Sequence, residues 1–175
     1  MSLTGSRPMP FIRVENGRAV EATDTFTTVA DDAALPADGG AIVSLARFIK
    51  DRDALLARNA PIGVRLKSDE TPEGLGPDLA RLSVVAIEFP SFADGRGFSW
   101  ARMLRTRLGF TGEVRAVGPY IYDQLAYLVR TGFDAFAPTL KLGADDVNRA
   151  LAEMTYVYQP SADGKKTVRE LRSGS

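Results

Sequence analysis

The sequence predicts an α/β fold in which about five parallel strands alternate with helices. Short apolar runs of strand length recur along the chain, and amphipathic segments of helix length separate them. Residues 84–117 form one complete strand, helix, strand unit within the length that such a unit needs. A content of 45% apolar and 25% charged residues in 175 is ordinary for a globular domain. This alternation indicates a mostly parallel sheet covered by helices.

Two arrangements of such a sheet fit the alternation. One is an open doubly wound sheet of the flavodoxin/Rossmann-like type, and the other is an incomplete (β/α) barrel. We expect the open sheet, because five units are too few for an eight-stranded barrel. Ligands bind at the carboxyl ends of the strands in both arrangements, so the position of a site does not depend on the choice.

A small β-hairpin is expected first. Asn16-Gly17 lies between the short apolar runs of residues 11–21, and these residue types tolerate the positive φ that a type I′ turn requires. Residues 23–40 are rich in Thr, Asp, Ala, Pro and Gly, which is typical of an irregular connector. The expected division of the chain is a hairpin with connector at 1–40, one α/β domain at 41–160 and a flexible polar tail at 161–175.

The main domain is then assigned element by element. The expected strands are the apolar runs at 41–45, 62–66, 84–89, 113–117 and 134–137, with an extra strand at 156–160. The expected helices are 47–59, a short helix at 78–82 after the loop 68–77, and then 100–108, 119–130 and 144–154. The clearest helix places Trp100, Leu104 and Leu108 on one stripe. Pro61 ends the first helix, and Gly132 caps the fourth.

The charge balance argues against some partners. The 22 basic and 22 acidic residues cancel, so the net charge does not attract nucleic acid or an anionic membrane. No apolar run approaches the roughly 20 residues of a membrane span, and the first residues lack the apolar core of a secretory signal. We therefore expect a cytoplasmic protein that binds neither nucleic acid nor membrane.

Two missing residue types limit the chemistry. Without Cys there is no thiol nucleophile, thiolate metal site or cysteine-ligated iron–sulfur cluster. Without His there is no imidazole base, Ser-His triad or His-ligated metal. No metal site and no cofactor is predicted, while a bound flavin or nicotinamide cofactor stays open because redox work would require one.

The loops after the third and fourth predicted strands contain the candidate site. Gly95 and Gly97 allow a tight turn at the start of a helix, whose free N–H groups favour an anion that Arg96 could also bind. The candidates for binding an oxyanion or a partner are Asp94, Gly95, Arg96, Gly97, Ser99, Arg102, Arg115 and Asp123, with Glu88 as a further candidate. We treat the catalytic residues as unknown.

Structural interpretations stand beside the functional ones. Asp94 or Ser99 could simply cap the helix, and the loop matches neither a P-loop nor the GxGxxG fingerprint. Glu88 and Asp94 could form an acid/base pair, or Asp94 could form an ion pair with Arg96 or Arg102. The arginines of this region are either a solvated helix face or a surface for an acidic partner. Trp100 is expected in the core.

Three stretches together carry a family resemblance. They read FPSFADGRGFSWARMLR, GFTGEVRAVG and DQLAYLVRTGFDAF, followed by YQP near residue 160. With them the chain resembles the DUF934 family of uncharacterised bacterial proteins. Members of that family are usually encoded beside assimilatory sulfite reductase and sulfate-assimilation enzymes, and are often labelled as oxidoreductases of sulfite reduction. The resemblance adds Gln124 to the candidates, because it matches a motif position of the family.

The chain departs from the family pattern at two positions. Thr131 stands where members often have Cys, which argues against an obligatory thiol redox role. Pro119 stands where members often have an acidic residue, which argues against a carboxylate function after the fourth strand. With no Cys, His or dinucleotide fingerprint, the side chains alone offer no ordinary route for electrons.

Two functions are therefore expected. The first is an accessory protein of assimilatory sulfite reduction that docks on sulfite reductase or its electron donor through the DGRG loop and nearby arginines. The alternative is an enzyme or binding protein of sulfur metabolism that holds a small molecule or oxyanion at the carboxyl ends of the strands.

Overall fold

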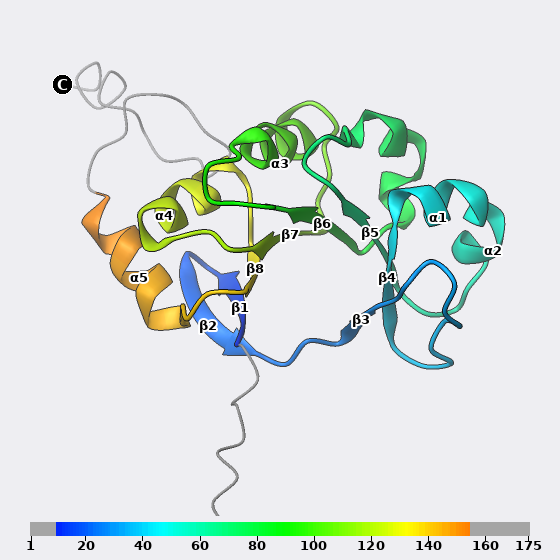
Figure 1. Cartoon of the computed structure of the whole chain (residues 1–175), viewed down its shortest axis with the longest axis horizontal. Coiled ribbons are helices and arrows are strands. Elements are labelled where there is room, and N and C mark those ends of the chain that lie inside the picture. Colours follow the sequence, from blue (N-terminus) through cyan, green and yellow to red (C-terminus); the bar gives the residue numbers. More distant parts are fainter. Residues whose placement is uncertain (1–9, 155–175) are drawn as a thin grey trace, which may run out of the picture.

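The computed structural model describes residues 10–154, and the expected strand at 156–160 and polar tail at 161–175 lie outside this range. Its strands are β1 (Phe11–Glu15), β2 (Arg18–Ala22), β3 (Phe26–Thr28), β4 (Gly40–Ser44), β5 (Ile62–Leu66), β6 (Val84–Glu88), β7 (Glu113–Gly118) and β8 (Ala135–Pro138). Its helices are α1 (Leu45–Lys50), α2 (Arg52–Leu56), the 3-10 helix η1 (Pro72–Arg81), α3 (Arg96–Thr106), α4 (Tyr122–Thr131) and α5 (Ala144–Glu153). Figure 1 shows their arrangement.

The eight strands form one curled, open sheet, a half-barrel, in the order β2-β1-β8-β7-β6-β5-β4-β3. Strands β3 to β8 are all parallel, whereas β1 runs antiparallel to both β8 and β2. The expectation of a doubly wound sheet with about five strands was wrong. Each new parallel strand from β3 to β8 lies next to the preceding one, so the order of these described strands never reverses and they form no switch point. This sequential order is that of a (β/α) barrel, the alternative arrangement.

The N-terminal hairpin is confirmed and joins the sheet. Asn16 and Gly17 have φ of 52° and 77°, as a type I′ turn requires. Strand β1 pairs with β8, and the outer edge of β2 is covered by α5. The side-chain amide of Asn148 accepts from the Ala19 N–H and donates to the Ala19 C=O, both at 2.8 Å. Asn148 thus forms the two backbone hydrogen bonds that a further strand would form with Ala19 at this edge of the sheet.

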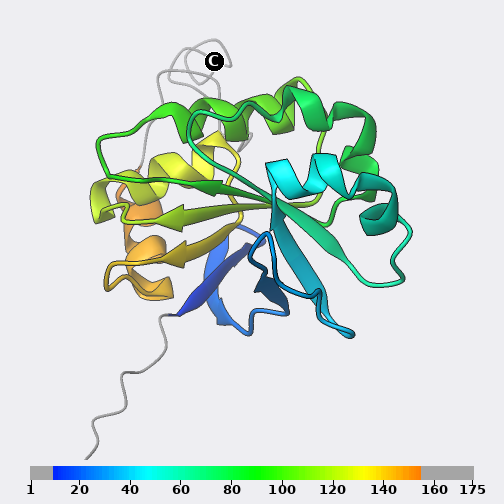
Figure 2. The ribbon, with the colours of Figure 1, turned by 45° about the vertical axis from the view of Figure 1, so that its right-hand side comes forward.

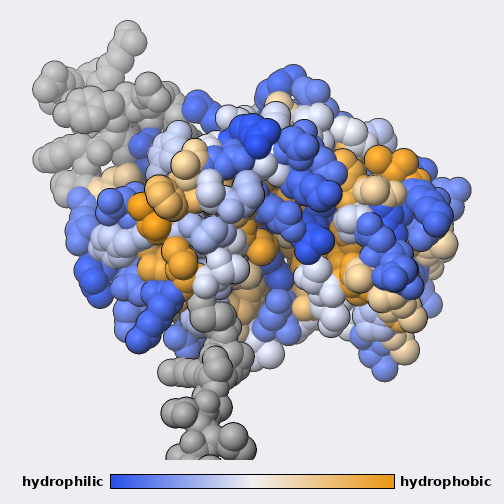
Figure 3. Space-filling view, in the orientation of Figure 1, coloured by the Kyte–Doolittle hydropathy of each residue, from blue (hydrophilic) through white to orange (hydrophobic). Residues whose placement is uncertain are grey.

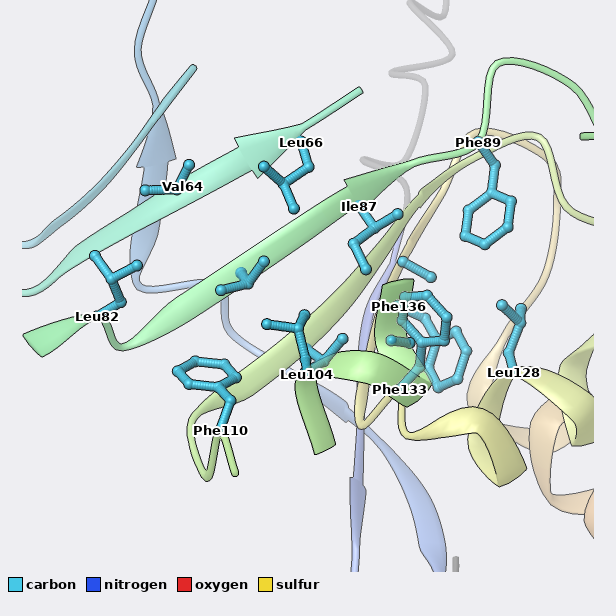
Figure 4. Close-up of a cluster of buried hydrophobic side chains, with 14 of the residues drawn as sticks. Val64, Leu66, Leu82, Ile87, Phe89, Leu104, Phe110, Leu128, Phe133 and Phe136 are labelled. Carbon is cyan, nitrogen blue, oxygen red and sulfur yellow. The ribbon is translucent and has the colours of Figure 1, made fainter. Parts of the chain in front are cut away.

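The main core lies between the convex face of the sheet and the helices, which Figures 1 and 2 show along that side. Strand β6, VVAIE, is apolar on both faces because the sheet is covered on both. Ile87 and Phe89 project toward α3 and α4, where Leu104 and Leu128 are completely buried (Figure 4). Aromatic contacts reinforce this layer, with the rings of Phe89 and Phe133 5.7 Å apart.

The concave face contains a smaller apolar cluster and several charges. Ile42, Val84 and Ala86 are buried there beneath Phe26. On the outside of the molecule, hydrophilic side chains cover much of the face drawn in Figure 3, and hydrophobic ones gather in separate areas. Within the described residues, no helix has the length and apolar character needed to cross a lipid bilayer.

Candidate functional site

The loop after β6 and the start of α3 are organised by one carboxylate. Asp94 Oδ1 accepts hydrogen bonds from the backbone N–H and the Nε of Arg96, each at 3.1 Å, and Arg96 Nη2 lies 2.7 Å from Asp94 Oδ2. The helix starts at Arg96, four residues before the expected start at Trp100, with Gly95 as its N-cap and no side-chain hydrogen bond at that cap. The Arg96 guanidinium and N–H hold the pKa of Asp94 well below its usual range.

The structure confirms the ion-pair interpretation of the DGRG segment. Arg96 remains 55% exposed, but its bidentate edge is directed at Asp94. Gly97 serves packing, because a Cβ there would come within 2.7 Å of the Phe89 ring. Gly118, with φ of 133°, lies directly against the Phe89 carbonyl and leaves no room for a side chain. These glycines let α3 and the end of β7 approach the end of β6.

A second loop, which follows β5, is tied to the first. Arg96 Nη2 donates to Ser68 Oγ at 2.9 Å, and Trp100 Nε1 donates to the Ser68 carbonyl at 2.9 Å. Trp100 is partly buried against the core, and its indole N–H is satisfied by this loop. The loops after two neighbouring parallel strands are therefore held together at the carboxyl edge of the sheet.

A pocket of about 280 Å³ lies between these two loops. We call it the rim pocket, and it is lined by Lys67, Ser68, Asp69, Glu88, Pro90 and Arg96. Glu88 Oε1 lies 3.0 Å from Arg65 Nε on the concave face. The position is where (β/α) barrels bind their ligands. Two of the predicted site residues, Glu88 and Arg96, thus line the rim pocket, and Asp94 holds the Arg96 side chain in place.

Arg115 lies apart from the rim pocket, on the concave face of β7. Its side chain is 4% exposed and donates to Glu113 Oε1 at 2.7 Å and to both oxygens of Asp24 at 2.8 and 3.0 Å. Its guanidinium lies 4.4 Å from the ring centre of Phe11 and 5.8 Å from that of Phe26. Through these contacts Arg115 holds Asp24, in the segment after β2, against the concave face of the sheet.

The remaining candidates lie on the helical side. Gln124 Nε2 donates to the Phe92 carbonyl at 2.8 Å, and Gln124 Oε1 accepts from the Ile121 N–H at 3.1 Å, so this side chain joins α4 to the loop after β6. Ser99, Arg102 and Asp123 are exposed on α3 and α4. None of these four lines the rim pocket.

Two further features bear on the chemistry. Tyr120 is completely buried and donates to the Ala116 carbonyl at 3.3 Å, and burial raises the pKa of its phenol well above the usual value. It packs and does not titrate near neutral pH. Among residues 10–154 no group of three or more acidic side chains is placed to hold a metal ion.

Three residues at this edge of the sheet were not predicted as site residues: Arg65, Lys67 and Ser68. The signal for Arg65 was a charge inside an apolar strand, next to a strand ending in Glu88. Alternation along each strand places the side chains of Arg65 and Glu88 on the face shared with Gly63 and Ala86.

A larger pocket of about 950 Å³ lies between β2 and the start of α5, and no predicted site residue lines it.

Comparison with known protein families gives a match. A family model described as "Bacterial protein of unknown function (DUF934)" matches residues 63–169, which include the rim pocket and the loops around it. Neither a curated protein nor a solved structure matches the chain.

Proposed function

The chain belongs to the DUF934 family, whose model covers more than half of it, and from this premise we propose that it is an accessory protein of assimilatory sulfite reduction. In this role it docks on sulfite reductase or its electron donor through the loop after β6. The observation that supports docking is an exposed aromatic ring on the loop that leads into α3, whose first residue is an exposed arginine. Phe92 is 59% exposed, four residues before Arg96.

The proposed docking face has the composition of an interface centre. It consists of Phe92, Arg96 and Tyr127, the last of which is 45% exposed and lies 4.9 Å from the ring centre of Phe98. Aromatic residues and arginine dominate binding energy at protein interfaces. Gln124 and Asp94 hold the backbone of this loop in place, so little conformational entropy is lost when a partner binds.

Substitution of Phe92 tests the docking function. Its side chain is largely exposed, and Gln124 contacts only its backbone carbonyl, so Phe92→Ala should leave the fold intact. We expect this change to weaken binding of purified sulfite reductase, or of its electron donor, by about tenfold or more. Biolayer interferometry with the immobilised wild type and variant measures the effect.

Ile49→Ala is the matched control, because Ile49 is 67% exposed on α1, outside the docking face. Its affinity for the partner should equal that of the wild type. If the wild type binds neither the reductase nor the donor, or if both variants bind equally, the docking function is wrong.

A second candidate function is favoured by the rim pocket. The pocket lies at the carboxyl ends of two adjacent parallel strands and contains a lysine, an arginine and a serine. In this function the chain binds a small molecule or oxyanion of sulfur metabolism there. Arg96 then contributes through the part of its guanidinium that Asp94 and Ser68 do not use.

A further inference from the structure

The rim pocket carries charges of both signs in equal number. Lys67 and Arg96 supply two cations, and Asp69 and Glu88 supply two carboxylates. Asp69 lies close enough to Arg96 to contribute, after Asp94, to the raised pKa of the guanidinium. A ligand with negative charge alone would meet repulsion from the two carboxylates together with attraction to the two cations. The electrostatics therefore favour a ligand that carries both signs.

Both kinds of charge retain unused hydrogen-bonding capacity. Among residues 10–154, the Lys67 ammonium forms no hydrogen bond or ion pair, and Arg96 donates through Nε and Nη2 but not Nη1. Of the two carboxylates, Asp69 accepts no hydrogen bond from the described residues, and Glu88 pairs with Arg65 through Oε1, which leaves Oε2 for a ligand. Two donors and two acceptors at this pocket are thus open to a ligand.

The size of the pocket restricts the ligand further. About 280 Å³ falls just below the range of roughly 300–1,000 Å³ typical of drug-sized molecules. We propose that the rim pocket binds a small zwitterion of the amino-acid class, with its carboxylate toward Lys67 and Arg96 and its ammonium toward Asp69 and Glu88. This inference rests on the second proposed function and names its ligand class.

The pocket has its own spectroscopic reporter. Trp100 is the single tryptophan of the chain, and its indole N–H donates to the carbonyl of Ser68, which lines the pocket. A ligand that contacts Lys67 and Asp69 alters the loop that holds this hydrogen bond. Tryptophan emission therefore reports binding without any assay of activity.

The experiment titrates the full chain with each proteinogenic amino acid while recording tryptophan emission and the thermal unfolding midpoint. Acetate and methylammonium serve as single-charge analogues, and sulfite, sulfate and phosphate as oxyanions. We expect at least one amino acid to bind saturably, about tenfold or more tighter than either analogue. Lys67→Gln and Asp69→Asn should each weaken that binding about tenfold, whereas Lys50→Gln, an exposed change on α1, should not.

The other outcomes overturn the inference in distinguishable ways. If only the oxyanions bind, the ligand class is wrong but the second function stands. If an amino acid binds to both pocket variants as tightly as to the wild type, the ligand lies elsewhere and the inference is wrong. If no compound changes either signal, both the inference and the second function are wrong, while the docking function remains subject to its own test.

Discussion

Asp94 is the residue on which the geometry of the docking loop depends most. Its carboxylate receives the backbone N–H and the guanidinium of Arg96, so the first turn of α3 and the exposed arginine share one acceptor. Because Arg96 also reaches Ser68, the loss of this carboxylate would loosen both loops at the rim pocket. Asp94 therefore fixes both the backbone at the start of α3 and the position of the Arg96 guanidinium.

The stability that Asp94 provides should depend on pH. Arg96 lowers the pKa of this carboxyl in the folded state, so folding favours its ionised form. The contribution is fully present above the ordinary carboxyl pKa, near 4, and is lost as the pH falls from there through the lower pKa of the folded state. Asp94→Asn should therefore lower the thermal unfolding midpoint at pH 7, and its difference from the wild type should shrink below about pH 4.

Thermal melts from pH 7 to pH 3 measure this difference. Asp32→Asn is the control, since Asp32 is an exposed loop residue without an ion pair among the described residues. Its difference from the wild type should stay near zero throughout. A constant Asp94→Asn difference across the range would show that the carboxylate does not act through its charge.

Single residues also show how far the site could be predicted from sequence. Asp94 and Arg96 are two positions apart, so their ion pair was available as an interpretation from local spacing. The partners Ser68 and Arg65 depend on the register between β5 and β6, which no local pattern encodes. The local sequence places Arg115 in the correct strand, but it does not predict that Asp24 and Glu113 are its ion-pair partners.

At the level of elements, the long periodic segments were predicted well and the short ones poorly. The apolar strand β6 and helix α4 lie within two or three residues of their expected bounds. Strand β3 falls inside the expected connector, because its three residues gain regular structure only by pairing with β4. The loop expected at 68–77 is largely the 3-10 helix η1, which starts at Pro72 and contains Pro77.

The contact between α5 and the sheet edge offers a test at this scale. Asn148 satisfies both backbone groups of Ala19 on β2, and Asn148→Ala would leave them unpaired. We expect the free energy of unfolding to fall by about 1–3 kcal/mol, the cost of unsatisfied polar groups at a partly buried site. Urea denaturation measures the change.

Asn59→Ala provides the matched comparison for this helix contact. Asn59 is exposed and its side chain forms no hydrogen bond among the described residues, so its removal should change the free energy of unfolding by no more than about 0.5 kcal/mol. Equal stabilities for the two variants would mean that Asn148 does not support the edge of β2.

For the whole molecule, the chain path explains why the sheet curls. Strands β2 and β3 are the two ends of the sheet order, yet only Thr23, Asp24 and Thr25 separate them in sequence. Such a link spans at most about 14 Å, so the sheet must bend until its two ends approach each other. A doubly wound sheet has the same alternation of strands and helices. The sequence pattern therefore could not distinguish the two, because strand order depends on where each crossover returns.

The pair Asp24 and Arg115 is the charged contact that holds this link over the concave face. We expect Arg115→Met to reduce the free energy of unfolding by about 1–3 kcal/mol, because the buried Glu113 loses its hydrogen bond from Arg115 and keeps the one from Arg13 Nη2 at 3.1 Å. Asp24→Asn should cost less, since Asp24 is partly exposed. A double-mutant cycle should give a coupling energy of about 0.5–3 kcal/mol between them.

Urea denaturation of the four proteins in the cycle supplies these free energies. The control cycle combines Asp24→Asn with Arg107→Met, because Arg107 lies past the end of α3 beside Glu73 and shares no partner with Asp24. Its coupling should lie within about 0.5 kcal/mol of zero. Equal coupling in both cycles would mean that the link is held by the backbone and by Phe26 packing on the apolar cluster of the concave face, and not by the ion pair. Strong coupling for Arg115 alone would show that a residue in the middle of β7 and a three-residue link together keep the half-barrel curled.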